Sequence, residues 1–163
     1  MNRDQHQGFT LVELLIALAL MGTLLALALP SFGRFQENKR VLISRDLLTS
    51  HVQQTRVSAI NSGRPHQLCG SSDGEKCDGD WGSYWLITTV GKTPSVLRQQ
   101  AAPSSSICRT AFGGTGIRFH PNGTSGTSNG KLTICNTDGP HHVLTLNRQG
   151  RLKVEESHNS GCC

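Results

Sequence analysis

Aromatic side chains are scarce in this chain of 163 residues, which has five Phe, two Trp and one Tyr. With so few large apolar rings, and with eighteen Gly and six Pro, any globular part should have a thin core and many turns. Hydrophobic residues make up 36% of the chain and are concentrated near its N-terminus. The rest of the chain is too short for two separate cores. We therefore expect one hydrophobic helix and one small, loop-rich β domain.

The sequence also lacks the motifs of common enzyme classes. No nucleophile, base and orienting acid have a recognisable arrangement, and no glycine-rich loop has the spacing that cradles phosphate. The histidines His120, His141 and His142 lack zinc-ligand spacing, and the acidic loop 73–80 lacks the spacing of a calcium-binding EF-hand. We predict no enzymatic activity, no cofactor and no metal site.

The longest apolar run extends from Phe9 to Leu29, which is 21 residues. As a helix it would span about 30 Å, the thickness of the hydrocarbon core of a bilayer. Thr10, Glu13 and Thr23 are its markedly polar members. A carboxyl group in such a segment costs about 2.5 to 3.5 kcal/mol on insertion scales, so Glu13 calls for a partner.

Two simpler interpretations of this run fit it less well. A secretory signal peptide would be cut after the A-x-A pattern at 26–28, but Asp4 lies in its basic region and Glu13 interrupts its apolar region. A plain membrane anchor would place Glu13 near the interface, where charged side chains can reach water.

The stretch Gly8-Phe-Thr-Leu-Val-Glu13, with the apolar run after it, resembles the prepilin leader of type IV pilins and type II secretion pseudopilins. The resemblance implies that a membrane peptidase cleaves between Gly8 and Phe9 and methylates the new N-terminus, giving N-methylphenylalanine. It also implies that Glu13, the fifth residue of the mature chain, pairs with the N-terminal amine of a neighbouring subunit. In apolar surroundings such a pair fixes register more than it adds stability.

Beyond Pro30, apolar residues at helical spacing predict that the helix continues to about Ser62, ending at Gly63 and Pro65. The predicted apolar face consists of Phe32, Phe35, Val41, Leu48, Val52 and Ala59. Short alternating runs then predict an antiparallel β headpiece. Its expected strands are 67–69, 84–90, 95–99, 116–120, 131–136, 142–147 and 151–155.

Six cysteines, all after the apolar run, indicate an oxidising compartment, because no C-x-x-C pair suggests zinc or redox chemistry. We expect Cys69 to pair with Cys77 across a glycine-rich turn, and Cys108 with Cys135 between strands. The adjacent Cys162 and Cys163 would form a strained ring. They could instead stay reduced, bridge to another subunit or exchange with the other four.

Four blocks of sequence resemble the GspH/FimT family of minor pilins and pseudopilins. They are Arg56–Pro65, the two tryptophans Trp81 and Trp85, Ile117–Gly123 and Leu146–Leu152. The resemblance implies an α+β type IV pilin fold: a long N-terminal helix, its first half in the membrane or filament core, and a small antiparallel two-sheet β headpiece stapled by disulfides.

The formal net charge is +5, and residues 37–163, with fourteen Lys/Arg and nine Asp/Glu, carry the same excess. A basic headpiece suits phosphate backbones or acidic surfaces, although it also serves plain solubility. In the C-terminal hairpin, Arg148 lies at the turn, and Arg151 and Lys153 share one strand face. Gly150-Arg-Leu-Lys153 resembles the Gly-Arg-x-Arg element of DNA-binding FimT-like pilins. Lys153 replaces the second arginine and loses its bidentate fork.

The sequence thus predicts a minor type IV pilin that binds extracellular DNA non-specifically for natural transformation. Alternatives are a structural minor pilin that primes pilus assembly and a GspH-like pseudopilin of a type II secretion system. Expected partners are other major and minor pilins, prepilin peptidase, the inner-membrane assembly platform and DNA. The protein would first be a single-pass inner-membrane protein with a periplasmic headpiece, and later part of an extracellular pilus. The predicted parts are the leader 1–8, the membrane or filament-core helix 9–29, its amphipathic continuation 30–62 and the headpiece 63–163.

Overall fold

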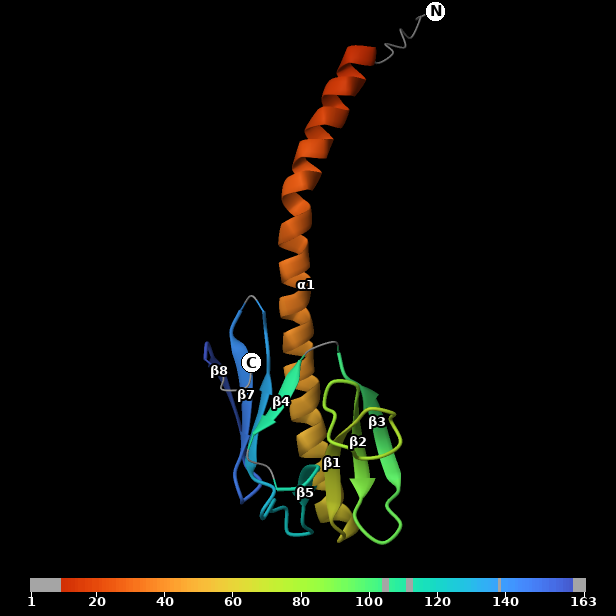
Figure 1. Ribbon diagram of the computed structural model, residues 1–163, viewed down its shortest axis with the longest axis vertical. Coiled ribbons are helices and arrows are strands. Elements are labelled where there is room, and N and C mark those ends of the chain that lie inside the picture. The colour runs from red at the N-terminus through yellow and green to blue at the C-terminus, as the bar shows by residue number, and fades with distance from the viewer. Residues whose placement is uncertain (1–9, 104–105, 111–112, 138, 160–163) are drawn as a thin grey trace, which may run out of the picture. The chain divides into compact units, whose positions relative to one another are not determined.

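The structure, a computed structural model, describes residues 10–103, 106–110, 113–137 and 139–159. One long helix, α1 (Leu11–Ser62), is followed by eight strands in two four-stranded sheets. The chain forms two compact units that divide after Gln36. We call residues 10–36 the helical unit and the described residues from Glu37 onward the headpiece, and Figure 1 shows the order of the elements.

In the helical unit, α1 begins with a side-chain cap. The Thr10 hydroxyl accepts a hydrogen bond from the Glu13 amide (3.3 Å), and the Thr10 carbonyl accepts one from the Leu14 amide (3.2 Å). Thr10 is thus an N-cap residue, and Glu13 places its carboxylate in the first turn, where the helix dipole favours negative charge. Where exposure is described, that is at residues 10–26, 32, 33, 35 and 36, the large apolar side chains of this unit are exposed, from Leu25 at 54% to Leu11 at 75%. No helix among the described residues has an apolar stretch long enough to cross a membrane.

The headpiece part of α1 turns an apolar face into the core. Val41, Leu48, Val52 and Ala59 are at most 1% exposed, as their helical spacing predicts. The prediction was wrong for Phe32 and Phe35, which are 64% and 57% exposed. Both belong to the helical unit, whereas the buried core residues all lie in the headpiece.

The helix ends as its sequence predicts. Its last residue is Ser62, and Gly63 follows with a φ of +64°, in the left-handed region that glycine adopts without strain. The Gly63 amide donates to the Ile60 carbonyl at 3.3 Å, which closes the last turn.

All pairings between neighbouring strands are antiparallel. The first sheet has the order β3-β2-β1-β5, formed by β1 (His66–Ser71), β2 (Tyr84–Thr89), β3 (Val96–Ala101) and β5 (Gly116–Phe119). The second has the order β4-β6-β7-β8, formed by β4 (Ile107–Thr110), β6 (Gly130–Ile134), β7 (His141–Leu146) and β8 (Leu152–Ser157). The predicted α+β pilin-type architecture with two sheets is therefore confirmed. The sequence did not predict β4, a four-residue strand at a sheet edge.

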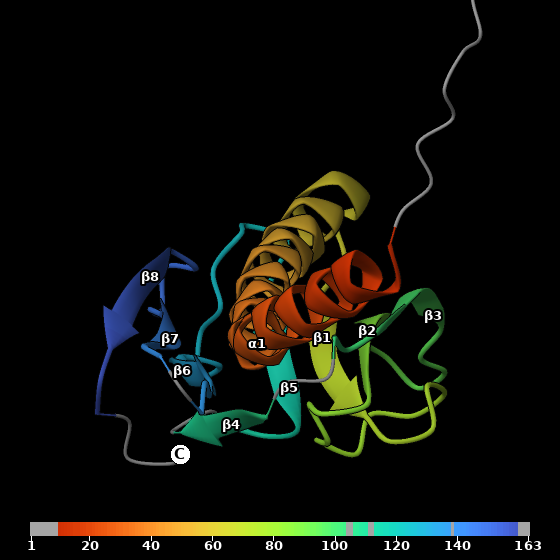
Figure 2. The same cartoon turned by 90° about the horizontal axis from the view of Figure 1, so that it is seen from above.

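Both sheets lie on one side of the headpiece part of α1, as the view from above shows (Figure 2). The core between helix and sheets is continuous, because both sheets contribute buried side chains to one cluster. Trp85, Ile87, Ile117 and Phe119 come from the first sheet. Leu132, Ile134, Leu144 and Leu146 come from the second.

Candidate functional site

The predicted functional residues fall in two separate regions of the chain. Gly8 and Phe9, the predicted cleavage and methylation residues, lie outside the described residues. Glu13 lies in the first turn of α1 with its side chain exposed. The role of Glu13 in assembly stays a prediction.

The C-terminal hairpin is a rigid two-strand unit with a tight turn. β7 and β8 pair from His141 opposite Ser157 to Leu146 opposite Leu152. The turn is closed by hydrogen bonds from the Asn147 amide to the Arg151 carbonyl (3.1 Å) and from the Gly150 amide to the Asn147 carbonyl (3.0 Å). The Asn147 side chain also accepts from the Arg151 amide at 2.8 Å. The hairpin therefore fixes the backbone of the two arginines that flank this turn.

Gly150 is required at the turn for two reasons. Its φ is +78°, and a Cβ there would lie 2.4 Å from the Gly123 carbonyl oxygen. Arg56 of α1 reaches the same turn, and its Nη1 donates a hydrogen bond to the Gly150 carbonyl at 3.2 Å. The Arg56 Nε is buried without a hydrogen-bond partner. Arg56 thus anchors the turn to the helix, a structural role that its place in a predicted helix did not reveal.

Two of the three predicted cations are available for an anionic ligand. Arg148 and Arg151 are exposed, and neither takes part in an ion pair within the described residues. Lys153 is exposed as well, but its Nζ lies 2.6 Å from the Glu155 carboxylate. Because Glu155 compensates its charge, Lys153 contributes less positive potential than the sequence pattern predicts.

Strand register explains which side chains face outward. Leu152 is opposite Leu146 and Val154 is opposite Leu144, so these two β8 residues face the core side of the second sheet. Leu152 packs against the core, whereas Val154, on the edge strand, stays 39% exposed. Lys153 is on the other face, opposite Thr145. A cleft of about 430 Å³ lies there, lined by Thr145, Asn147, Arg151, Leu152 and Lys153.

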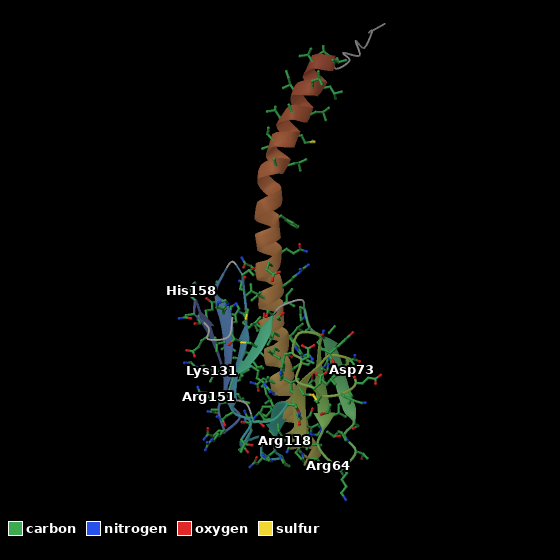
Figure 3. All side chains as sticks on the ribbon, in the orientation of Figure 1. Arg64, Asp73, Arg118, Lys131, Arg151 and His158 are labelled. Atoms are coloured by element: carbon green, nitrogen blue, oxygen red, sulfur yellow. A yellow bond between two sulfur atoms is a disulfide. The ribbon has the colours of Figure 1, made fainter. Side chains whose placement is uncertain are left out.

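Both flanks of the headpiece carry charges of both signs, since Glu155 and Glu156 lie on β8 and Lys76 lies in the acidic loop. Figure 3 shows Arg151 and Lys131 on the flank formed by the second sheet, and Asp73 on the opposite flank. The segments 113–131 and 143–154 contain no Asp or Glu, although Glu155 and Glu156 follow directly on β8.

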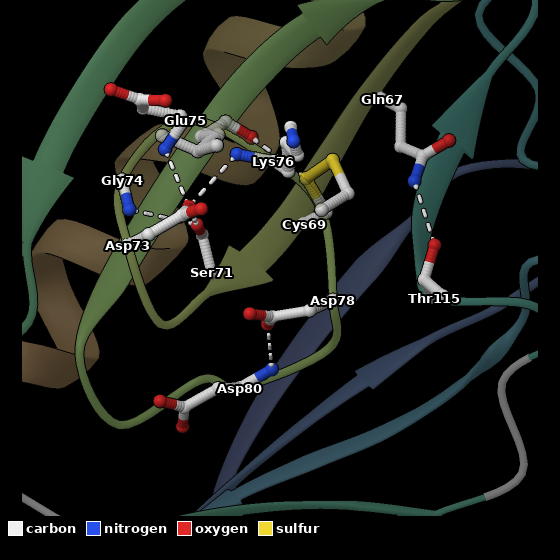
Figure 4. The surroundings of a disulfide bond; sticks show 12 residues. Gln67, Cys69, Ser71, Asp73, Gly74, Glu75, Lys76, Asp78, Asp80 and Thr115 are labelled. Atoms are coloured by element: carbon white, nitrogen blue, oxygen red, sulfur yellow. Dashed lines mark hydrogen bonds between the residues drawn. A yellow bond between two sulfur atoms is a disulfide. The ribbon is translucent and has the colours of Figure 1, made fainter.

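The acidic loop holds its own backbone in place (Figure 4). The Asp73 carboxylate accepts hydrogen bonds from the amides of Glu75 (2.8 Å) and Lys76 (3.0 Å) and from the Ser71 hydroxyl (2.9 Å). The two amides, with the hydroxyl, lower the pKa of Asp73 to about 2. Asp78 accepts from the Ser72 amide and hydroxyl and from the Asp80 amide, which lowers its pKa as well.

Through these hydrogen bonds, the carboxylates of the loop cap the backbone amides of the same loop. Among the described residues, no three His, Cys, Asp or Glu side chains gather as metal ligands would.

The disulfide Cys69–Cys77 closes the acidic loop, as its glycine-rich spacing predicts. Cys108 and Cys135 are also disulfide-bonded, and the described residues contain no free cysteine. Cys108 is opposite Thr133, and the Cys135 amide donates to the Ser106 carbonyl at 2.8 Å, so the two cysteines are not directly opposite each other. Their pairing with each other stays a prediction, and Cys162 and Cys163 lie outside the described residues.

Known proteins match both regions of the chain. The family model of the type II transport protein GspH matches residues 45–150. The prokaryotic N-terminal methylation motif matches residues 3–29.

Two crystal forms of the type IV minor pilin FimU from Pseudomonas aeruginosa, strain PAO1, share the fold at 21% identity. One superposes with a TM-score of 0.57 over 70% of this chain and 91% of that chain. The other reaches 0.60 over 74% and 92%.

Proposed function

The chain belongs to the GspH family and is a minor pilin or pseudopilin of the type IV class, and from that premise we propose that it is incorporated in a pilus and binds DNA through its C-terminal hairpin. Binding would be independent of base sequence, because the contacts offered are cations suited to phosphate oxygens. Its biological purpose would be the capture of extracellular DNA for natural transformation.

Processing and assembly depend on the N-terminal region in this proposal. Prepilin peptidase would cleave between Gly8 and Phe9 and methylate Phe9. The apolar helix would hold the subunit in the inner membrane, at the assembly platform, until it enters the filament. Glu13 would then pair with the N-terminal amine of a neighbouring pilin. The match to the N-terminal methylation motif at residues 3–29 and the exposed apolar side chains of the helical unit support this part.

One observation carries the DNA-binding part: two exposed arginines, with no ion-pair partner among the described residues, lie in and directly after a turn closed by hydrogen bonds. Arg148 lies in the turn and Arg151 follows it, with Asn147 and Gly150 fixing the backbone. An arginine can bind a phosphate with two parallel hydrogen bonds, and a fixed backbone lowers the entropy lost on binding. Lys153, held by Glu155, would add little.

Binding of a labelled DNA duplex by the full chain, in an uncharged detergent, tests this proposal by fluorescence anisotropy. We expect weak binding at low salt, and the two hairpin arginines should contribute about −2 to the slope of log K against log salt, because each neutralises one phosphate. The double variant Arg148→Gln/Arg151→Gln should lose most of the binding, and Lys153→Gln should change it less than twofold. No binding at low salt, or binding unchanged in the double variant, would refute DNA recognition by the hairpin.

The match to the GspH family favours one other candidate, a pseudopilin of a type II secretion system. Its headpiece would contact exported proteins instead of DNA. Anisotropy separates the two candidates, because a pseudopilin headpiece has no need of a salt-dependent affinity for duplex DNA. A structural minor pilin that primes assembly would behave like the pseudopilin in this assay and would differ in the filament that contains it.

A further inference from the structure

A second polar cleft lies beside the hairpin, at the free edge of the first sheet. Its volume is about 440 Å³. It is lined by residues 113–116, by three hydroxyl residues between 125 and 128, and by the side chains of Gln67, Arg118 and His120. We call it the Arg118 cleft. It contains none of the residues of the proposed hairpin site.

The sheet register directs Arg118 into this cleft. Ile117 and Phe119 are at most 1% exposed in the core, so the alternation of β5 turns Arg118 outward. Gln67 of β1 is directly opposite Arg118 and therefore projects from the same face. The Gln67 side-chain amide donates to the Thr115 hydroxyl at 3.4 Å (Figure 4). A guanidinium group, an amide and a hydroxyl thus share one outward-facing hollow.

The loop that forms one wall is held from the second sheet. Arg109 of β4 donates from Nη1 to the Gly114 carbonyl at 2.6 Å. Gly114 has a φ of +82°, a conformation that a residue with a side chain rarely adopts. This side of the cleft is therefore a turn whose backbone conformation is held by a hydrogen bond from β4.

The Arg118 cleft and the hairpin turn share a hydrogen-bonded wall. The amides of Ser125 and Gly126 both donate to the Arg148 carbonyl, at 3.1 and 3.2 Å. The buried Ser125 hydroxyl donates to the Asn147 carbonyl at 2.6 Å. One side of this wall thus carries Arg148, and the other side borders the hollow that contains Arg118.

The chemistry of the cleft fits a phosphodiester group. Arg118 is exposed and has no ion pair within the described part of the chain. Thr115, Thr127 and Ser128 also line the cleft, and their hydroxyl groups are possible hydrogen-bond donors. The loop segments 113–116 and 125–128 contain no carboxylate. Phosphate oxygens accept hydrogen bonds from guanidinium and hydroxyl groups, and no carboxylate of these segments competes for the donors.

We infer that the Arg118 cleft binds a further phosphate group of the same DNA, so that the nucleic acid crosses the Ser125–Gly126 wall between Arg118 and the hairpin arginines. This inference rests on the proposed DNA binding. It adds a contact from the first sheet to a site otherwise built from the second sheet, and it names Arg118 as the residue that makes it. His120 flanks the same phosphate position.

The test compares single-charge variants of the full chain, in an uncharged detergent, with a labelled DNA duplex. Arg118→Gln should lower the affinity severalfold at low salt and make the slope of log K against log salt shallower by about one, because one phosphate contact is lost. Arg118→Lys should keep the slope and lower the affinity less, since the charge remains and the fork is lost. Urea unfolding of both variants should match the unchanged chain, because Arg118 is exposed.

Lys92→Gln is the matched control. It removes one exposed positive charge between β2 and β3, on the side of the first sheet away from β5, and should leave the slope unchanged. If Arg118→Gln behaves like Lys92→Gln while Arg148→Gln/Arg151→Gln abolishes binding, the cleft inference is overturned and the hairpin proposal stands. If the unchanged chain does not bind DNA at low salt, both are overturned.

Discussion

The described leucine side chains are exposed in the first part of α1 and buried or partly buried in the second. Leu14 and Leu18 of the helical unit are 58% and 57% exposed, whereas Leu48 of the headpiece is fully buried. In the headpiece, two sheets of the same chain cover the helix. No strand of the described residues covers the helical unit, so its described apolar side chains stay exposed, as they do at interaction surfaces. The headpiece thus has a core of its own, whereas the exposed apolar side chains of the helical unit suit the proposed contacts with neighbouring subunits.

The largest effect should follow from Glu13→Gln in the helical unit. If Glu13 pairs with a neighbouring N-terminus, loss of its charge breaks a buried ion pair worth about 3 to 5 kcal/mol, which lowers incorporation about a hundredfold or more. Immunoblots of sheared filaments against whole cells measure it. Glu37→Gln, which removes a partly exposed headpiece acid 3.8 Å from Arg40, is the control and should leave incorporation unchanged. Equal incorporation of both variants would contradict the assigned role of Glu13.

A matched pair of leucines tests the burial contrast directly. Leu48→Ala should lower the free energy of unfolding of the headpiece by about 2 to 5 kcal/mol, because it leaves a cavity in the core. Leu18→Ala should change it by less than about 0.5 kcal/mol, since Leu18 is exposed. Urea unfolding followed by tryptophan fluorescence reports on Trp81 and Trp85, both in the headpiece core. Similar losses in the two variants would show that the units do not differ as described.

Removing the Cys69–Cys77 disulfide should have a smaller effect on the headpiece. The bond closes a loop with a sequence separation of 8, and chain entropy predicts a loss of about 2 to 3 kcal/mol in the double variant Cys69→Ser/Cys77→Ser. Urea unfolding without reductant measures this loss. The carboxylate caps at Asp73 and Asp78 also hold the loop, so the measured loss should lie at the low end. An unchanged midpoint of unfolding would mean that these caps, and not the disulfide, hold the loop closed.

Acidification should weaken the headpiece through His142. Burial, with the nearby charge of Arg45, lowers the pKa of His142 below its ordinary value of 6.5. The unfolded chain therefore binds a proton more readily than the folded one, and the free energy of unfolding should fall as the pH drops below 6.5. Thermal unfolding between neutral and mildly acidic pH measures the slope. His142→Asn should flatten it, and a slope that persists in this variant would assign the effect to another group.

The smallest effect should come from Asp73 at lower pH. Its pKa falls from 3.8 to about 2 on folding, so its contribution is complete above 3.8 and is lost as the pH falls toward 2. Asp73→Asn should remove that part of the pH dependence and leave the His142 region unchanged. Because Asp73 is exposed, a large loss of stability at neutral pH in this variant would mean that the loop does more than cap itself.

Local signals predicted most of the headpiece. Gly63 and Pro65 mark the end of α1, and the turn at Asn147–Gly150 marks the hairpin, because each depends on residues adjacent in sequence. The strand β4 was missed, since its four residues, Ile-Cys-Arg-Thr, offer too short an alternation to separate a strand from a loop. The exposure of Phe32 and Phe35 was missed because helical spacing states which residues share a face and not whether anything covers that face.

The candidate site was predicted in part. Arg148 and Arg151 were identified from the turn and the strand pattern. Glu155 and Glu156 follow Lys153 in the sequence and already indicated a weaker basic patch, and the structure pairs Lys153 with Glu155. Arg118 was missed entirely, because it lies in β5 while the hairpin that it borders begins in β7. No sequence pattern connects residues that meet across two sheets.

The sequence by itself determined the leader-like N-terminus, the apolar run, the helix end, the two-strand turn and the excess of positive charge, because each depends on composition or on neighbours in the chain. The tertiary structure alone decided which apolar face is covered, that Arg56 anchors the hairpin turn, and that Ser125 and Gly126 join the Arg118 cleft to Arg148. The physical reason is that burial and hydrogen bonding depend on which distant segments come within a few ångströms, and two sheets packed on one helix bring together residues that the chain keeps far apart.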